Sequence, residues 1–283
     1  MNINDLLIYG RQYLLNTNIE NIPLKIRLLL EHILNMNKFE LVINHTKEID
    51  YNKINEFKLG LEKIKNNIPI QYIINKQEFM KLNFYVDENV LIPQPDTEIL
   101  VEEIIKYCKT HSNTTKIKIL DLCTGSGAIA ISLAKYIDNC EIVASDISNK
   151  AIQIAKLNAE KNLVHKKITF IESDMFTNIN IHDFDIIVSN PPYIESSTIP
   201  TLSLEVQKEP LLALDGGTDG LDFYRNIITN CHKFLKKDGK LFLEIGYNQK
   251  NKLFELINNS ENLHDVTCIK DLNNNDRVII CTY

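Results

Sequence analysis

The sequence lacks the features that would place the chain in a membrane or in an oxidising compartment. No apolar run approaches the ~18 residues that a membrane-spanning helix requires. The six cysteines form no C-x-x-C pair and have no metal-ligand spacing with the seven histidines. Because most of the cysteines lie within apolar segments, we expect reduced thiols in the protein core and no metal site.

The amino terminus lacks a targeting signal, and the chain as a whole lacks excess positive charge. Residues 1–5 have neither the basic region and apolar core of a signal peptide nor the arginines of a transit peptide. The formal net charge of −6 disfavours indiscriminate binding to nucleic acid, which normally needs a basic surface. The sequence therefore predicts a cytoplasmic monomer that binds neither membranes nor nucleic acid directly.

The composition is otherwise that of a globular protein with room for two domains. Of the 283 residues, 44% are hydrophobic and 24% are charged, which is ordinary for a chain with a buried core. Residues 1–70 carry apolar positions at helical spacing and no catalytic constellation, so they predict a small helical substrate-recognition domain. Residues 71–95 predict a linker with a hairpin, in which segments 71–74, 78–79 and 84–86 are extended.

Residues 96–283 alternate between apolar strands and helices. This alternation predicts an α/β fold with a doubly wound, mostly parallel, seven-stranded and Rossmann-like sheet. One helix is expected to begin with Asp96 as its N-cap, and another is expected near residues 221–236. The expected strands lie near residues 117–122, 141–145, 168–172, 184–189, 240–245, 265–270 and 277–282.

A strand, a glycine turn and a helix follow one another between residues 117 and 134. The turn has the sequence Cys-Thr-Gly-Ser-Gly (residues 123–127), and Asp121 comes shortly before it. Glycines let a ligand approach the backbone closely, and a helix amino terminus offers N–H groups. The dinucleotide fingerprint G-x-G-x-x-G is incomplete because its third glycine is missing, which favours a nucleoside ligand without a pyrophosphate.

Acidic residues follow the next two expected strands. Asp146 ends the second strand, where an acidic side chain can hydrogen bond to ribose hydroxyls. Asp174 follows the third strand and is a candidate partner for an adenine amino group, with Met175 packed on the ring. The alternative for Asp174 is a solvated strand end. The alternative for Asp121 is hydrogen bonding to the amides of the glycine turn.

The most informative segment is the Asn-Pro-Pro-Tyr loop (residues 190–193), which directly follows the apolar strand at 184–189. Ligands of open α/β sheets bind at the carboxyl edge of the strands. Since proline lacks an N–H group, the loop presents carbonyl oxygens and one asparagine side chain. Such a site can accept two hydrogen bonds from a planar –NH2 group, whereas the four residues taken alone equally fit an ordinary proline-rich loop.

Together these motifs resemble the class I S-adenosylmethionine-dependent methyltransferases and, more narrowly, the bacterial peptide-chain-release-factor glutamine N5-methyltransferases. The resemblance is carried by residues 92–98, 121–130, 188–194, 209–210, 213–217, 219–225 and 244–246. It implies S-adenosyl-L-methionine as cofactor and methylation of the glutamine side-chain amide in the GGQ motif of peptide chain release factors. The family commonly has Arg where this chain has Gln94, so a charge contact at that position does not carry over.

The resemblance and the motifs together assign the site residues. The expected catalytic residues are Asn190, Pro191 and Tyr193. The expected substrate contacts are Asn190, Pro191, Pro192 and Tyr193. The expected cofactor contacts are Asp121, Cys123, Thr124, Gly125, Ser126, Gly127, Asp146, Asp174, Met175 and Asn190. Glu205 and Glu209 either order a loop over the substrate or are surface charges.

Three other functions compete with this interpretation. The Asn-Pro-Pro-Tyr loop also suits the exocyclic amines of adenine or guanine, so a DNA or RNA amino-methyltransferase is the alternative within the class. The acidic balance and the absence of a basic stripe in the helical region speak against it. A nicotinamide oxidoreductase would require the third glycine of the dinucleotide fingerprint, which is missing, and would give no role to the Asn-Pro-Pro-Tyr loop. A catalytically silent nucleoside-binding subunit would fit the fold, although the motif set is intact.

Overall fold

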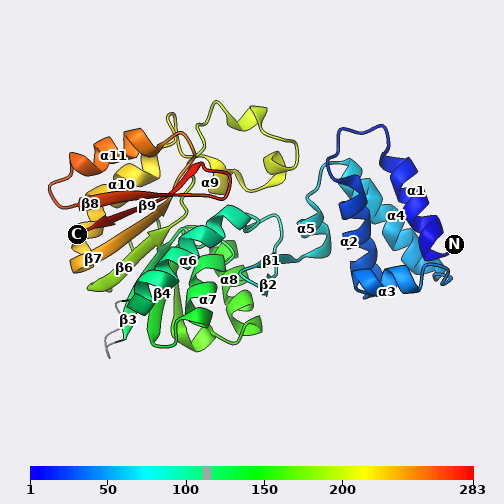
Figure 1. Ribbon diagram of the computed structural model, residues 1–283, viewed down its shortest axis with the longest axis horizontal. Helices are drawn as coiled ribbons and strands as arrows, with labels where there is room; N and C mark the ends of the chain where they lie inside the picture. Colours follow the sequence, from blue (N-terminus) through cyan, green and yellow to red (C-terminus); the bar gives the residue numbers. More distant parts are fainter. Residues whose placement is uncertain (111–115) are drawn as a thin grey trace. The chain divides into compact units, whose positions relative to one another are not determined.

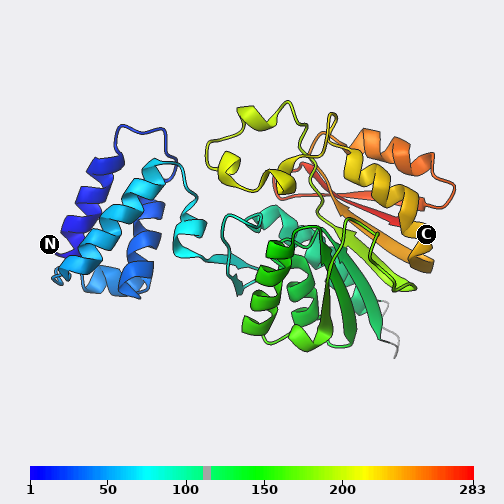
Figure 2. The ribbon, with the colours of Figure 1, turned by 180° about the vertical axis from the view of Figure 1, so that it is seen from behind.

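The computed structural model describes residues 1–110 and 116–283, which form two compact units (Figures 1 and 2). The first unit comprises Met1–Lys76 together with Ser203–Lys208. The second comprises Gln77–Leu202 and Glu209–Tyr283. Within the described residues, no helix is both long enough and apolar enough to cross a membrane.

The first unit is helical, as its apolar spacing predicts. Its helices are α1 (Ile3–Leu14), α2 (Ile22–Leu34), α3 (Lys38–Ile43), α4 (Tyr51–Lys65) and α5 (Ile70–Ile74). Asn2, Asn37 and Asp50 begin α1, α3 and α4 by accepting backbone N–H groups at the helix starts. The apolar faces enclose one core that includes Leu6, Leu14, Ile26, Leu30, Phe57 and Leu61.

Residues 71–74 are helical, so the prediction that they are extended is wrong. The β-branched residues of this run favour a strand locally. However, the Pro69 carbonyl accepts hydrogen bonds from Tyr72 and Ile73, and Ile70 is buried in the helical core. Tertiary packing therefore overrides the local preference, and α5 ends at Asn75, whose φ of 50° is left-handed.

The predicted hairpin is confirmed by β1 (Gln77–Phe79) and β2 (Leu82–Phe84), which pair antiparallel, although the second strand lies at 82–84 and not at the predicted 84–86. The two residues between the strands, Met80 and Lys81, have φ angles of 50° and 58°. Left-handed backbone at both central residues matches the right-handed twist of a two-residue hairpin.

The second unit contains a seven-stranded sheet in the order β5-β4-β3-β6-β7-β9-β8. The strands β3 to β7 pair parallel, and β9 runs antiparallel to both of its neighbours. This arrangement confirms the predicted doubly wound, mostly parallel sheet. The strands are β3 (Ile117–Leu122), β4 (Cys140–Asp146), β5 (Ile168–Glu172), β6 (Phe184–Ser189), β7 (Leu235–Glu244), β8 (His264–Lys270) and β9 (Asp276–Thr282).

The order of the strands places a switch point between β3 and β6. From β3 the chain moves outward through β4 and β5, and it then returns to the other side of β3 with β6. Loops that leave two neighbouring strands in opposite directions open a crevice at the carboxyl edge. The glycine turn follows β3 and the Asn-Pro-Pro-Tyr loop follows β6, so the fold brings the two motifs to one crevice.

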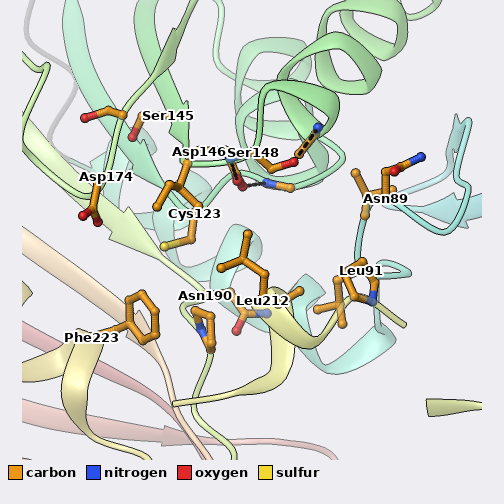
Figure 3. A pocket seen from close by; sticks show the side chains of 18 of the residues that line it. Asn89, Leu91, Cys123, Ser145, Asp146, Ser148, Asp174, Asn190, Leu212 and Phe223 are labelled. Atoms are coloured by element: carbon orange, nitrogen blue, oxygen red, sulfur yellow. Dashed lines mark hydrogen bonds between the residues drawn. The ribbon is translucent and has the colours of Figure 1, made fainter. Parts of the chain in front are cut away.

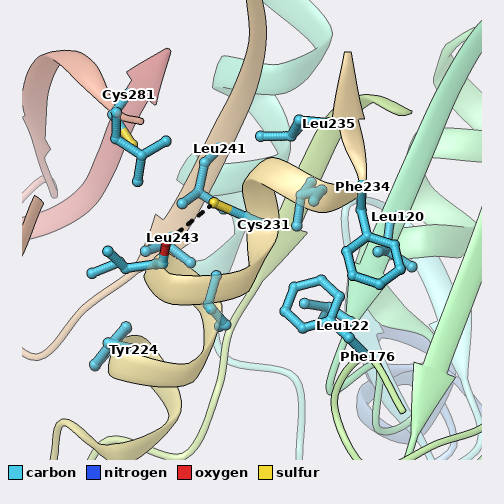
Figure 4. Close-up of a cluster of buried hydrophobic side chains, with 14 of the residues drawn as sticks. Leu120, Leu122, Phe176, Tyr224, Cys231, Phe234, Leu235, Leu241, Leu243 and Cys281 are labelled. Carbon is cyan, nitrogen blue, oxygen red and sulfur yellow. Dashed lines mark hydrogen bonds between the residues drawn. The ribbon is translucent and has the colours of Figure 1, made fainter. Parts of the chain in front are cut away.

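Helices cover both faces of the sheet (Figures 1 and 2). One face carries α6 (Pro95–Thr110), α7 (Ala128–Tyr136) and α8 (Asn149–Lys161), and the other carries α10 (Asp222–Asn230) and α11 (Lys250–Asn258). Figure 4 shows part of the core on the second face, where Leu120 and Leu122 of β3 lie among residues that include Tyr224.

Two predicted helix boundaries are wrong. Asp96 is not the N-cap of α6 but lies in its first turn, because Pro95 already occupies the first helical position. The helix predicted near 221–236 ends at Asn230, and β7 begins at Leu235. The Phe234 carbonyl accepts a hydrogen bond from the Phe184 N–H group on β6. This pairing with the sheet prevents the helix from continuing to residue 236.

Candidate active site

A cavity of about 280 Å³ lies at the carboxyl edge of β3, β4 and β6 (Figure 3). Among the described residues that line it, every charged one is acidic, namely Glu88, Asp146 and Asp174. Much of the remaining lining is apolar and includes Leu91, Leu212, Ala213, Phe223, Pro192 and Pro210. An acidic and apolar lining suits a cationic ligand with an apolar body and repels a pyrophosphate.

The glycine turn between β3 and α7 has the geometry of a ligand cradle. Gly125 and Gly127 have φ angles of 54° and 81°, which favour glycine. A Cβ atom at Gly125 would meet nothing within 4 Å, so the space beside its backbone is open. A Cβ atom at Gly127 would lie 2.9 Å from Ile131 Cδ1 and 3.1 Å from Ala155 Cβ. Gly125 thus admits a ligand, and Gly127 permits close helix packing.

Asp121 lies beneath the glycine turn and not in the lining of the cavity. Its Oδ2 accepts hydrogen bonds from Thr124 Oγ1 at 2.6 Å and from the Ala130 N–H at 3.2 Å. Complete burial raises the pKa of Asp121 to about 7, although these two hydrogen bonds act to lower it. Asp121 therefore organises the turn, as its alternative role proposed, but it does so through the Thr124 hydroxyl and an amide of α7 and not through the amides of the turn. Thr124 and Ser126 are buried with it.

Asp146 lines the cavity and also holds the glycine turn (Figure 3). Its Oδ2 accepts the Gly125 N–H at 2.8 Å, and its Oδ1 accepts the Ser148 N–H at 2.9 Å. Burial raises the pKa of Asp146, while the backbone hydrogen bonds oppose the rise. Since a carboxylate offers about four acceptor positions, Asp146 retains capacity for ligand hydroxyls.

Asp174 and Met175 reach the same cavity from the loop after β5. Asp174 is exposed and lies across the cavity from the Asn-Pro-Pro-Tyr loop (Figure 3). Met175 is buried, and its Sδ lies 3.9 Å from Cys123 Sγ. Both sulfur-bearing side chains line the cavity, which supplies polarizable apolar surface for an aromatic base.

The Asn-Pro-Pro-Tyr loop contributes Asn190 and Pro192 to the lining, whereas Pro191 and Tyr193 are not among the lining residues. The Asn190 Nδ2 donates a hydrogen bond of 3.2 Å to Thr97 Oγ1 on α6. Its Oδ1 is then available as an acceptor for a ligand. Tyr193 is half-buried against the core of the sheet, and burial raises the pKa of its hydroxyl.

A glycine-rich segment (residues 215–220) and Gln249 hold the Asn-Pro-Pro-Tyr loop in place. Gln249 Nε2 donates to the Tyr193 carbonyl at 2.9 Å and to the Gly220 carbonyl at 3.1 Å. A Cβ atom at Gly216 would lie 2.7 Å from Tyr193 Cα, and one at Gly220 would lie 2.4 Å from the Tyr193 carbonyl oxygen. The backbone of this segment therefore packs directly on the loop.

Several residues of the site were missed from the sequence. The segment 88–91 forms one wall of the cavity but carries no motif of its own. Asn158 on α8 is fully buried, and its Nδ2 donates to the carbonyls of Ser126 and Tyr85 at 2.9 and 3.0 Å. It ties the glycine turn to the segment that leads into this wall. The one sequence signal for Asn158 was that a polar residue occupies a buried position of an amphipathic helix.

Glu205 and Glu209 have different surroundings. Glu205 forms an ion pair with Lys25 of α2 within the first unit. Glu209 is buried in the second unit, where its Oε2 accepts the Ile92 N–H at 2.9 Å. Glu209 thus orders the chain next to the cavity wall, and its burial raises its pKa to about 7.

We expect Glu209→Gln to change how stability depends on pH. Since the pKa of Glu209 rises from 4.5 to about 7 on folding, the folded protein holds this proton more tightly than the unfolded chain. The resulting stability is complete below a pH of 4.5 and is lost as the pH rises through about 7. Glutamine keeps an acceptor for Ile92 but cannot ionise, so the variant should gain up to roughly 3 kcal/mol relative to wild type at alkaline pH.

Melting curves of both proteins at about pH 5 and about pH 8 test this expectation. The same change at exposed Glu261 provides the matched control. Parallel pH profiles for wild type and Glu209→Gln would show that Glu209 does not bind its proton more tightly in the folded state.

Comparisons with known proteins agree with this architecture. Residues 95–206 match the family model of the methyltransferase small domain, and residues 5–74 match that of the PrmC N-terminal domain. The release factor glutamine methyltransferase of Clostridium acetobutylicum is 38% identical over 283 residues, covering 99% of this chain and 98% of that protein. Its counterpart from Clostridium botulinum is 39% identical over 285 residues, with the same two shares.

A solved structure supports the fold at lower identity. The catalytic domain of hMettl16, in complex with the MAT2A 3′UTR hairpin 6, aligns with a TM-score of 0.55 and 15% identity. The alignment covers 82% of this chain and 86% of that one. At this identity the likeness concerns the fold alone.

The doubly wound sheet and the acidic cavity beside its glycine turn define a class I S-adenosylmethionine-dependent methyltransferase. The relatives match over nearly their full length, so the helical first unit is included in the likeness. The chain belongs to the family of release factor glutamine methyltransferases. The resemblance inferred from the motifs is confirmed.

Proposed function

We propose that the chain transfers a methyl group from S-adenosyl-L-methionine to the side-chain amide nitrogen, N5, of the glutamine in the GGQ motif of a peptide chain release factor. One observation carries the proposal: Asn190 lines the same cavity as Gly125 and Asp146, and its Nδ2 is bound to Thr97. An acceptor for an amide N–H therefore lies beside a nucleoside-type site. The names of the relatives supply the substrate class.

The residues of the cavity fit the cofactor. The open space at Gly125 suits the methionine part, and Asp146 suits the ribose hydroxyls. Asp174, Met175 and Cys123 line the same cavity, where Asp174 would accept a hydrogen bond from the adenine amino group and the two sulfur-bearing side chains would pack on the ring. The acidic lining complements a sulfonium cation. When bound, S-adenosyl-L-methionine supplies an electrophilic methyl group.

The Asn-Pro-Pro-Tyr loop positions the nucleophile. An amide nitrogen is a weak nucleophile because its lone pair is delocalised into the carbonyl group. If Asn190 Oδ1 and the Pro191 carbonyl each accept one N–H of the substrate amide, they orient its nitrogen toward the methyl group. Such positioning is worth roughly 7–11 kcal/mol. Charge that develops on the nitrogen strengthens both hydrogen bonds in the transition state, and the extra proton leaves to water afterwards.

We assign different roles to three segments of the chain. Residues 1–70 recognise the release factor and residues 71–95 link the two parts, with residues 88–91 adding one wall of the cavity. Residues 96–283 supply the rest of the cofactor site and carry out transfer. The helical region offers no catalytic cluster in the sequence, which supports a role in recognition. We further propose that the protein acts as a monomer on its protein substrate, in the cytoplasm and without direct binding to nucleic acid.

Mass spectrometry of purified release factor after incubation with the enzyme and methyl-labelled cofactor tests the proposal. We expect one added methyl group, located on the glutamine side chain by fragmentation. An adenine-containing oligonucleotide, offered in a parallel reaction, tests the amino-methyltransferase alternative. Label on the oligonucleotide with none on the release factor would overturn the proposed substrate.

We expect Asp146→Ala to weaken binding of S-adenosyl-L-methionine by ~1–3 kcal/mol, because ligand hydroxyls would lose a buried acceptor. Calorimetry measures the change, with NAD as a comparison ligand that should not bind to the wild-type protein. Asp146→Asn keeps one acceptor oxygen and should lose less. Unchanged affinity in Asp146→Ala, or tight binding of NAD, would contradict the assignment of Asp146 to the ribose.

A further inference from the structure

Beneath Asn190 lies a small group of buried polar side chains from distant parts of the chain. Thr97 comes from the first turn of α6 and is 4% exposed, and Glu244 ends β7 and is 2% exposed. The Asn190 Nδ2 donates to Thr97 Oγ1 at 3.2 Å. Hydrogen bonds from Thr97 and Asn190 also reach the Glu244 carboxylate, where they oppose the burial that raises its pKa to about 7.

The chemistry of these groups gives the hydrogen bonds a direction. Above a pH of about 7 Glu244 is ionised and its carboxylate only accepts hydrogen bonds, whereas a threonine hydroxyl has one proton to donate. Thr97 therefore donates its proton to Glu244 and accepts from its other neighbour. That neighbour, Asn190, must present its NH2 group, so its Oδ1 is directed away from Glu244.

Arg277 on β9 makes a carboxylate at this buried position tolerable. Its positive charge lowers the pKa of Glu244. Arg277 is itself held by Asp96 and Asp271, whose carboxylate oxygens lie 3.0 and 3.1 Å from its Nη2. One oxygen of Glu244, Oε2, has no hydrogen-bond partner among the described residues. A buried carboxylate with an unsatisfied oxygen lowers the stability of the fold, and such destabilising groups are typically kept where they serve a function.

We propose that Thr97 and Glu244 are positioning residues that determine which end of the Asn190 side-chain amide faces the substrate. The inference rests on the proposed function, in which Asn190 Oδ1 accepts a hydrogen bond from the glutamine amide. A flipped Asn190 would present NH2 to the substrate NH2, so two donors would face each other and the hydrogen bond would be lost. Thr97 and Glu244 act through Asn190 and need not touch substrate or cofactor.

The first test compares two substitutions at Thr97. Thr97→Val keeps the shape of the side chain but removes the hydroxyl, and Thr97→Ser keeps the hydroxyl. We expect kcat on release factor to fall about 10- to 100-fold in Thr97→Val, because small misplacements of a reacting group have effects of this size. KM for the release factor and affinity for S-adenosyl-L-methionine should change less than about threefold. Thr97→Ser should restore most of kcat.

The matched control is Thr282→Val, which removes another buried hydroxyl of the second unit. Thr282 lies on β9, where its Oγ1 accepts a hydrogen bond from Lys240. This variant measures the effect of losing a buried threonine hydroxyl outside the cavity. If Thr97→Val lowers the melting temperature as Thr282→Val does but leaves kcat unchanged, Thr97 is merely structural and the inference is wrong.

The second test asks whether Glu244 acts through Asn190. Above a pH of about 7, where Glu244 is ionised, Glu244→Gln replaces a pure acceptor by a group that also donates, so we expect kcat to fall with little change in KM. In an Asn190→Ala background the same substitution should cause no further loss, which single-turnover measurements with labelled cofactor can detect. An equal loss in both backgrounds would contradict the inference. The Thr97 variants decide the matter if Glu244→Gln does not fold.

The outcomes separate this inference from the proposed function. If the wild-type enzyme methylates the release factor and Thr97→Val does so equally fast, only the positioning role is overturned. If the wild-type enzyme does not methylate the release factor at all, the proposed function fails and the inference fails with it.

Discussion

Replacement of Asn190 by Ala is expected to abolish nearly all methyl transfer while the affinity for S-adenosyl-L-methionine stays within a few-fold. Asn190 lines the cavity with its Nδ2 bound to Thr97, and its Oδ1 is proposed to orient the substrate amide. Loss of one preorganised contact of this kind typically lowers kcat by about 10²–10³. Misalignment of the nucleophile adds to the loss, which should fall on kcat more than on KM.

Single-turnover methylation of release factor, measured beside a melting curve, tests this expectation. If Asn190 merely supports the end of β6, Asn190→Ala would melt at a lower temperature and the folded fraction would turn over at a near-normal rate. That result would remove the centre of the proposed mechanism. Asn190→Asp is a useful companion, because a carboxylate retains acceptor oxygens but loses the donor to Thr97.

Deletion of residues 1–76 should leave cofactor binding intact and remove most turnover on intact release factor, by ~10²-fold or more, since remote binding energy is used to position the reacting group. The cavity is lined only by residues of the second unit among those described. The shortened chain begins at Gln77, so it keeps residues 88–91, which form a wall of the cavity.

A short peptide that contains the GGQ sequence provides the control for this deletion. Wild type and the shortened chain should methylate the peptide at similar rates, whereas only wild type should act efficiently on the whole release factor. Full activity of the shortened chain on intact release factor would rule out a recognition role for the first unit. Loss of cofactor binding would instead show that the second unit needs the helices to fold.

The sequence predicted local structure correctly where residues close in sequence decide it. The seven predicted strands of the main sheet were all found because each is a short segment whose β-branched and apolar residues form a local pattern. Predictions failed where a distant partner decided the local structure. Residues 71–74 became helical because Ile70 packs in a helical core, and the helix near 221–236 ended early because Phe234 pairs with Phe184.

The sequence by itself determined the class of fold, the family and the two motifs at the edge of the sheet. Strand periodicity, glycine turns and proline loops each depend only on residues that are close together in the sequence. Only the tertiary structure decided which side chains surround Asn190. Thr97 lies 93 residues away from it in sequence, and the two meet because β6 and β7 pair and α6 packs against β7. Likewise, only the tertiary structure shows that Asp121 lies under the glycine turn while Asp146 lines the cavity, a choice that the sequence left open for Asp121.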